Sequence, residues 1–153
     1  MMEPPENLSI GDLFSGRVPF IIEKYQRDYA WDNDQIADFI NDIAFLYKKY
    51  DSFSPESRKE KRHFFGGIVS VLKVVPATST GRVYEVVDGQ QRLATFMIAI
   101  HHLSNAYKDL AVFCHENNNP DIESTAKAQQ EDTDENFIFY KEIEGSRRVP
   151  RLR

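Results

Sequence analysis

Residues 83–93 read VYEVVDGQQRL, and this stretch decides how the chain is expected to fold. Its first five residues are rich in β-branched side chains, which is typical of a strand, and the strand is expected to stop at Asp88 and Gly89. Apolar residues then recur every three or four positions, which predicts a helix over residues 90–108. The turn between strand and helix carries polar side chains: Asp88, Gln90, Gln91 and Arg92. We therefore predict a strand–turn–helix unit with a polar turn at its centre.

This polar turn allows two explanations. Asp88 and Gln91 have the spacing of a capping box, in which side chains satisfy the N–H groups of a helix start without any ligand. That explanation omits Arg92, whose charge is disfavoured there by about 0.3–1 kcal/mol, and Gly89, which costs about 1 kcal/mol relative to alanine if it is helical. An anion at the helix N-terminus would account for both residues, because glycine admits a ligand close to the backbone and arginine can fork onto phosphate. Both explanations remain open at this point.

The composition is that of an ordinary globular domain. The chain has 153 residues and a mass of 17.8 kDa, with 41% hydrophobic and 28% charged residues, which predicts one domain over residues 1–153. No apolar run approaches the roughly 18 residues of a membrane span. The first residues, MMEPPE, have neither the basic start nor the apolar core of a signal peptide, and the single cysteine permits no internal disulfide. We therefore expect a cytoplasmic protein with no membrane partner.

The charge is unevenly distributed along the chain. The net charge of −5 argues against non-specific nucleic-acid binding by the whole domain. Residues 115–136 carry seven acidic side chains and one lysine, so we expect an acidic segment that is partly flexible. Basic residues gather at 58–62 and at 147–153, where solvated loops are the simplest explanation.

Two further helices are expected before the central unit. Residues 10–14 are predicted to form a short helix with Ser9 as its N-cap. A longer helix is predicted over residues 32–50, where Asp32 and Gln35 have the spacing of a capping pair. Its apolar residues recur at helical spacing and are expected to be buried: Ile36, Phe39, Ile40, Ile43, Leu46, Tyr47 and Tyr50.

Three strands complete the expected secondary structure. Residues 18–22 are predicted to form a strand at a sheet edge or a strand start, because Pro19 cannot donate a backbone hydrogen bond. Residues 63–72 and 82–87 are predicted to pair as a hairpin around the turn at 76–81. A Gly66-Gly67 pair within the first of these strands indicates a bulge or a close approach of backbone or ligand.

Several well-known site types are missing from the sequence. There is no Gly-x-x-x-x-Gly-Lys-Ser/Thr phosphate loop and no Gly-x-Gly-x-x-Gly dinucleotide motif. The four histidines lack zinc-ligand spacing, and Cys114 follows apolar residues, which favours a small core residue over a nucleophile.

A second polar and aromatic cluster lies at residues 25–31, which read YQRDYAW. One interpretation is that Tyr29 and Trp31 anchor a loop to the core while Gln26 and Arg27 face water. The other places Gln26 and Arg27 beside the polar turn, with an aromatic ring available to stack on a base.

Taken together, three ordered motifs resemble a known family. Residues 25–35 read YQRDYAWDNDQ, residues 64–69 read FFGGIV, and residues 86–93 read VVDGQQRL. In this order they resemble the N-terminal domain of GmrSD-type modification-dependent restriction enzymes, the DGQQR-containing family of uncharacterised and phage-defence proteins. The resemblance runs from about Leu8 to Tyr107.

The resemblance implies a ParB/sulfiredoxin-like α+β fold, in which helices pack on a small mixed sheet. It also implies binding and hydrolysis of a nucleoside triphosphate, commonly GTP, UTP or CTP, with Mg²⁺. In longer members this activity is coupled to a separate nuclease domain that cuts modified DNA. By motif match the nucleotide-binding residues would be Gln26, Arg27, Gly66, Gly89, Gln90, Gln91 and Arg92.

The same match implies three catalytic residues, Asp88, Gln91 and Arg92. Arg92, with Arg27, would neutralise phosphate charge as cations do in phosphoryl transfer. Asp88 would cap the helix, hold the metal or orient water, and Gln91 would orient the attacking water.

Two departures from the family pattern affect these expectations. The family usually follows its arginine with Leu-Thr-Thr, whereas Ala94 replaces the first threonine here. No His-Asn-His constellation is present, so we expect the nuclease domain or subunit, and contact with DNA, to lie outside this chain. Residues 148–152, RVPRL, look like the start of the family's next segment, so we expect an N-terminal fragment of a longer protein.

Two other functions are alternatives for this sequence. A non-catalytic DNA- or protein-binding module could use the same turn to recognise phosphate, with the basic clusters at 58–62 and 147–153 supplying affinity. A sulfiredoxin-like activity would need a cysteine within the motifs, and Cys114 lies outside them.

Overall fold

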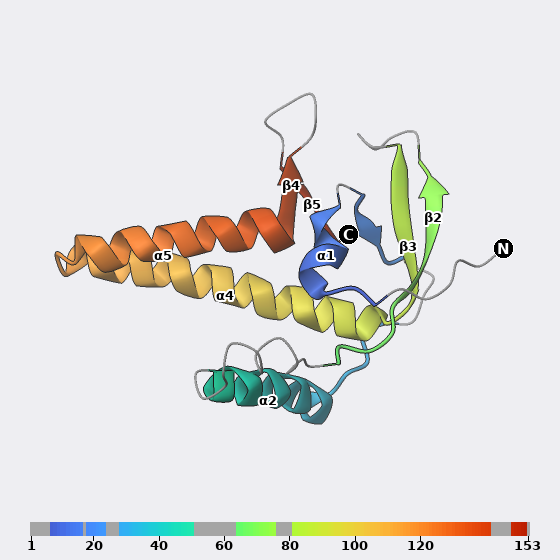
Figure 1. Cartoon of the computed structure of the whole chain (residues 1–153), viewed down its shortest axis with the longest axis horizontal. Coiled ribbons are helices and arrows are strands. Elements are labelled where there is room, and N and C mark those ends of the chain that lie inside the picture. Colours follow the sequence, from blue (N-terminus) through green and yellow to red (C-terminus); the bar gives the residue numbers. More distant parts are fainter. Residues whose placement is uncertain are drawn as a thin grey trace.

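A computed structural model describes residues 7–16, 18–23, 28–50, 64–75, 81–141 and 148–152. It confirms the predicted α+β class, with a small mixed sheet against which α1 and the start of α4 pack (Figure 1). The elements, in chain order, are α1 Ile10–Ser15, β1 Phe20–Ile21, α2 Asn33–Tyr50, β2 Val69–Val74, β3 Arg82–Asp88, α4 Gln90–Glu116, α5 Pro120–Thr133, the π-helix η1 Asp134–Ile138, β4 Phe139–Lys141 and β5 Arg148–Pro150.

The central strand of the main sheet is β3. It pairs with β2 in the predicted antiparallel hairpin and with β1 in parallel, which gives the strand order β1-β3-β2. On the outer side of β1, Leu152 forms a parallel bridge with Phe20, and the Phe20 N–H donates to the Arg151 carbonyl oxygen at 2.7 Å. The C-terminal segment therefore covers the edge that β1 would otherwise expose.

The strand predicted over residues 63–72 is displaced in the structure. Regular pairing covers Val69–Val74, and its register shifts between Val69 and Ser70. Gly66, with φ of +99°, interrupts an extended ladder. Residues 76–80 and His63 lie outside the described residues.

The core is built around the strand–turn–helix unit. Val86 of β3 and Leu93 of α4 are fully buried, and they pack with Phe14, Phe20 and Met97. Burying side chains of this size contributes about 1.5–3 kcal/mol each. The residues on either side of the polar turn are therefore fixed by core packing.

A chain of aromatic rings extends this core towards α2. The ring of Phe96 lies 5.7 Å from that of Phe65, and the Phe65 ring lies 6.0 Å from that of Phe39 on α2. Trp31 packs against Phe39 with a centroid separation of 6.0 Å. Aromatic pairs such as the two edge-to-face contacts of Phe65 add about 0.5–1.5 kcal/mol beyond area burial.

Both predicted N-terminal helices are present, each with the expected capping residues. Ser9 and Asp12 form a reciprocal capping box for α1, and the hydrogen bonds from Ser9 hold the pKa of Asp12 below its ordinary value. At the start of α2, Asp32 Oδ1 accepts from the Asp34 N–H at 3.0 Å, and the Asp32 N–H donates to Gln35 Oε1 at 2.7 Å.

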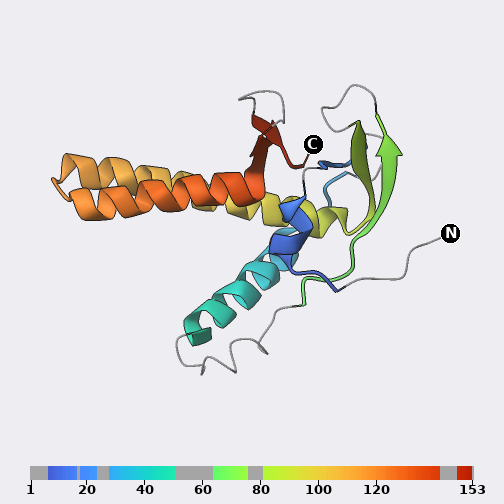
Figure 2. The same cartoon turned by 45° about the horizontal axis from the view of Figure 1, so that its top comes forward.

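The expected burial of the α2 apolar stripe is wrong for most of the helix. Phe39 is 6% exposed, whereas Ile43 is 41% and Tyr47 is 81% exposed. Only the start of α2 lies near the core, and Figure 2 shows the rest of the helix pointing away from α4. The periodicity therefore predicted the helix correctly. The row of aromatic rings, however, buries only the beginning of the apolar face of α2.

Residues 115–136 were expected to be partly flexible, and the structure instead places α5 and the start of η1 there. The helix α4 also continues past its predicted end to Glu116, and α4 and α5 form an antiparallel hairpin that extends away from the sheet (Figure 1). Pro120 at the first position and acidic residues in the first turn favour this helix start. Small side chains are buried in these two helices: Ser104, Ala111 and Cys114 on α4, and Ala126 on α5. The interpretation of Cys114 as a small core residue is confirmed.

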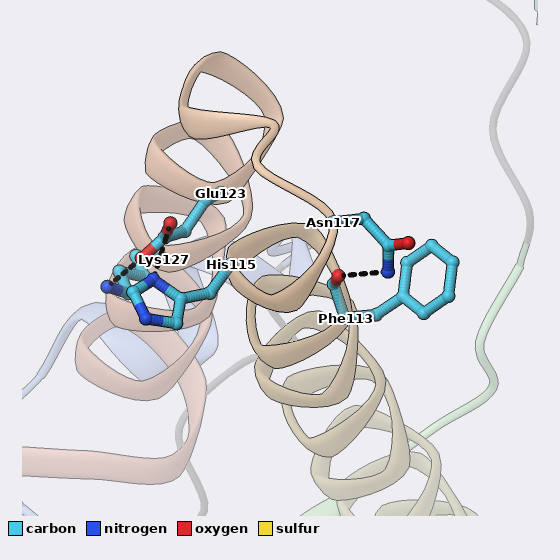
Figure 3. A network of polar contacts seen from close by, with 5 residues as sticks. All are labelled: Phe113, His115, Asn117, Glu123 and Lys127. Atoms are coloured by element: carbon cyan, nitrogen blue, oxygen red, sulfur yellow. Dashed lines mark hydrogen bonds and ion pairs between the residues drawn. The ribbon is translucent and has the colours of Figure 1, made fainter.

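Polar contacts hold the tip of this hairpin (Figure 3). Glu123 accepts a hydrogen bond from Lys127 Nζ at 2.6 Å and lies 3.1 Å from Nδ1 of His115. The hydrogen bond from Lys127 has the larger effect and that from His115 the smaller, and both hold the pKa of Glu123 below its ordinary value. Asn117 caps α4 by donating from its side chain to the Phe113 carbonyl oxygen at 2.8 Å.

Of the helices within the described ranges, none has both the length and the apolar character needed to cross a membrane.

Candidate functional site

The polar turn joins the end of β3 to the start of α4. Gly89 stands between them with φ of +85°, a left-handed conformation that a side chain makes costly. A Cβ atom added to Gly89 would lie 2.8 Å from the Gly67 carbonyl oxygen. Gly89 is therefore required both by its backbone angle and by the close approach of a neighbouring segment.

The capping-box explanation of this turn is wrong. Asp88 Oδ1 accepts from the adjacent Gly89 N–H at 2.8 Å, and no described side chain caps the start of α4. The Gln91 side chain does not cap the helix either, because it hydrogen-bonds to the backbone of Asp28 and Ala30. The first N–H groups of a 27-residue helix are thus left without a side-chain acceptor among the described residues, at the positive end of the helix dipole.

Arg92 lies on the segment that contains Gly66 and Gly67. Its Nη1 donates to the Gly67 carbonyl oxygen at 2.7 Å, and this is its one partner within the described parts of the chain. A Cβ atom at Gly66 would lie 2.7 Å from the same Nη1. The glycine pair therefore approaches the turn closely: Gly66 makes room for the guanidinium, and Gly67 accepts its hydrogen bond. Four of the five N–H donors of an arginine remain for a ligand.

The two glutamines of the turn make different contacts. Gln90 donates from Nε2 to the Val86 carbonyl oxygen at 3.1 Å, which ties the helix start to β3. Gln91 uses both ends of its amide on one loop: Oε1 accepts from the Ala30 N–H at 2.7 Å, and Nε2 donates to the Asp28 carbonyl oxygen at 3.1 Å.

The loop that Gln91 holds belongs to the second polar cluster. The Tyr29 hydroxyl lies 2.8 Å from Thr95 Oγ1, and Trp31 packs on Phe39. Anchoring of this loop by Tyr29 and Trp31 is thus confirmed. Gln26 and Arg27 lie outside the described residues, so their predicted place in the site stays a prediction.

Thr95 is the site residue that sequence reasoning missed. It is buried and hydrogen-bonds both to Tyr29 and to the Gln91 carbonyl oxygen. The sequence contained one hint, because Thr95 is the threonine that remains where the family pattern has two. Its partner, however, lies 66 residues away in the chain.

The start of α4 and Arg92 bring positive charge to the turn, which suits a phosphate. The turn also carries one carboxylate. Asp88 is exposed and is the acidic side chain of the turn. Across the described residues, no group of three or more His, Cys, Asp or Glu side chains could hold a metal ion. A metal at Asp88 would thus take its other ligands from outside the described residues, and substrate and water are the ligands that Mg²⁺ commonly uses with nucleotides.

The C-terminal basic cluster is not a free surface where the structure describes it. Arg151 is buried, and Arg148 Nη1 lies 3.7 Å from Asp134 Oδ2. The other members of that cluster and all of residues 58–62 lie outside the described residues. The described part thus lends no support to DNA binding through this cluster.

Comparison with known proteins identifies the family. No curated protein matches the chain. A family described as the GmrSD restriction endonuclease, N-terminal domain, matches residues 10–150. This match spans the chain from α1 to β5, so it also includes the end of α4, α5 and η1, which lie between the two parts that the sequence resemblance covered. The chain belongs to the family of N-terminal domains of GmrSD restriction endonucleases.

Proposed function

We propose that this domain binds a nucleoside triphosphate with Mg²⁺ at the start of α4 and hydrolyses it, as the regulatory part of a GmrSD-type restriction system. Membership of the family gives the chain a role in such a system. The observation that carries the nucleotide proposal is the uncapped start of α4, where Gly89 and Arg92 lie together. Helix N-termini with an adjacent arginine are well suited to phosphate.

In this proposal the turn supplies the phosphate contacts. The backbone N–H groups of Gln90 and Gln91 donate to phosphate oxygens, and the free donors of Arg92 neutralise the charge that develops in phosphoryl transfer. Arg27 would add a second cation from the first motif. Asp88 would hold Mg²⁺ or orient water, since a carboxylate suits a metal better than a bare phosphate.

The Gln91 side chain receives a different role from the one its motif implies. Orienting the attacking water would require its amide to leave Asp28 and Ala30, which occupy both of its ends. We therefore assign this side chain to holding the loop, and only its backbone N–H to phosphate.

The nuclease and DNA enter this proposal through the restriction system. The chain contains no His-Asn-His constellation, so cleavage of DNA is assigned to a nuclease domain or subunit beyond these residues. Nucleotide binding here would regulate that partner. GTP, UTP and CTP remain the candidate nucleotides.

A thermal-shift panel tests the proposal. Wild type and Arg92→Ala are heated with each of the four NTPs, with and without Mg²⁺, and Lys108→Ala serves as the control that removes an exposed positive charge from the same helix. A ligand at 100 times its Kd stabilises the native state by about 2.7 kcal/mol. For a domain of this size that raises Tm by about 5–10 °C.

The expected result is such a shift for one NTP in the presence of Mg²⁺, lost in Arg92→Ala and kept in Lys108→Ala. Release of inorganic phosphate from the same mixtures tests hydrolysis. Wild type that shows no shift with any NTP would contradict the proposal.

A further inference from the structure

The loop formed by Asp28, Tyr29 and Ala30 is attached to α4 by side chains that lie one helical turn apart. Gln91 binds the backbone of Asp28 and Ala30, and Thr95, four residues later, binds the Tyr29 hydroxyl. Residues four apart lie on the same helix face. We call the side chains of Tyr29, Gln91 and Thr95 the loop clamp.

The hydrogen-bond directions within the loop clamp follow from proton counting. A threonine hydroxyl has one proton, and Thr95 donates it to the Gln91 carbonyl oxygen at 2.8 Å. Tyr29 must then donate to Thr95 Oγ1. Thr95 is buried, so water cannot easily replace this donor.

Packing alone does not explain why Tyr29 is a tyrosine. Its side chain is 44% exposed, so the ring adds little to the core. A phenylalanine would fill the same space, and only the hydroxyl reaches Thr95. The clamp therefore positions the loop more than it stabilises the fold.

The loop clamp joins the two motifs of the proposed site. Gln91 is in the first turn of α4, where the phosphate contacts are proposed, and Asp28 directly follows Arg27 in the chain. A chain segment that is held in place before ligand arrives does not have to be ordered during binding, which lowers the free-energy cost of association.

We propose that Tyr29 and Thr95 are positioning residues of the nucleotide site, which hold the loop at Asp28–Ala30 against the start of α4. This inference rests on the proposed nucleotide binding. It assigns the Tyr29 hydroxyl and the Thr95 hydroxyl to nucleotide affinity, although neither touches the nucleotide.

The test measures Kd by isothermal titration calorimetry, with the NTP that gives the largest thermal shift, for Tyr29→Phe, Thr95→Val and the double variant. Two matched controls make the same chemical changes elsewhere. Tyr47→Phe removes an exposed hydroxyl that has no partner within the described residues. Thr133→Val removes a buried hydroxyl that makes the same bond to the carbonyl oxygen four residues earlier, at 2.7 Å.

Each clamp variant is expected to bind about 3- to 10-fold more weakly than wild type, which is the range for one lost hydrogen bond. The double variant should be no weaker than the worse single variant, because both substitutions break the same bond. The unfolding midpoints without nucleotide should change no more than those of the controls.

Hydrogen exchange gives a second measurement that a purely structural role would not reproduce. In Tyr29→Phe the Ala30 amide should exchange faster than in wild type, and saturating nucleotide should restore its protection. Clamp variants that bind within twofold of wild type, or effects that add in the double variant, would overturn the inference while leaving nucleotide binding intact. Wild type that binds no nucleotide would overturn both proposals.

Discussion

Gly66 and Arg92 show how single residues set the geometry of the candidate site. The backbone of Gly66 has φ of +99°, and the nearest atoms to a Cβ added there all belong to Arg92. A Cβ atom added to the next residue, Gly67, would meet nothing within 4 Å. The carbonyl oxygen of Gly67 accepts the Arg92 hydrogen bond. Neighbouring glycines therefore do different things: one leaves space for a side chain, and the other supplies a carbonyl oxygen.

Replacing these two glycines separately should change the free energy of unfolding by different amounts. Gly66→Ala is expected to lower the free energy of unfolding by about 1–3 kcal/mol, because alanine is strained at this φ and its methyl group displaces the guanidinium. Gly67→Ala should leave stability unchanged or raise it by about 0.4–1 kcal/mol, because the site has room and the unfolded chain loses freedom. Urea unfolding measures both. Equal losses in the two variants would contradict this account of Gly66.

The helix α2 shows how far an element can be understood from its own periodicity. Its start is anchored by Phe39, which packs between Trp31 and Phe65. Further along, Ile40 and Ile43 are 43% and 41% exposed, although they lie on the same apolar stripe. Periodicity reports which residues share a face, and it does not report how much of that face another element covers.

Two alanine substitutions on α2 test this difference in burial. Phe39→Ala should cost about 3–5 kcal/mol, because it removes a buried ring from the aromatic chain that links α2 to α4. Ile43→Ala should cost less than about 1 kcal/mol, because much of its side chain already meets solvent. Thermal or urea unfolding gives both values. A cost above about 2 kcal/mol at Ile43 would mean that the stripe is buried after all.

At the scale of the whole molecule, Arg151 connects the two ends of the domain. Its guanidinium donates to the carbonyl oxygens of Phe14, Gly16, Glu135 and Phe139. Two of these lie at the end of α1, and the other two lie in η1 and β4. Arg151 is also in the segment that continues the sheet beside β1, near the point marked C in Figure 1. The sequence interpretation of RVPRL as the start of a following segment overlooked this role, because these residues complete the fold of the domain itself.

Removing the Arg151 side chain should therefore destabilise the whole domain. The bond to the Phe14 carbonyl oxygen is buried and the other three are part-buried. A buried carbonyl oxygen left without a donor costs about 1–3 kcal/mol and a part-buried one less, so Arg151→Ala is expected to lose more than about 2 kcal/mol, a large part of the 5–15 kcal/mol typical of a domain. Arg148→Ala is the matched control, because its contact with Asp134 is a half-exposed ion pair at 3.7 Å and should be worth less than about 1 kcal/mol. Urea unfolding followed by circular dichroism compares them. Similar losses in the two variants would contradict the role assigned to Arg151.

The sequence by itself determined the local structure around the turn and the family. Spacing predicted the strand before Asp88, the helix after Gly89 and both N-terminal caps, because those features depend on residues a few positions apart. The order of three motifs identified the family that the comparison then showed. The same local reasoning failed at residues 115–136, where the acidic composition predicted a partly flexible segment. The structure has the helix α5 there, packed against α4.

Only the tertiary structure decided which distant residues meet at the turn. It showed that Gln91 and Thr95 hold the loop at Asp28–Ala30, that Arg92 lies on Gly67, and that Arg151 closes the domain onto α1. Each of these contacts joins residues separated by 25 to 137 positions. Sequence periodicity extends over one or two helical turns, so it cannot specify such pairs. They are selected by the packing of the complete core, where every buried polar group must find a partner.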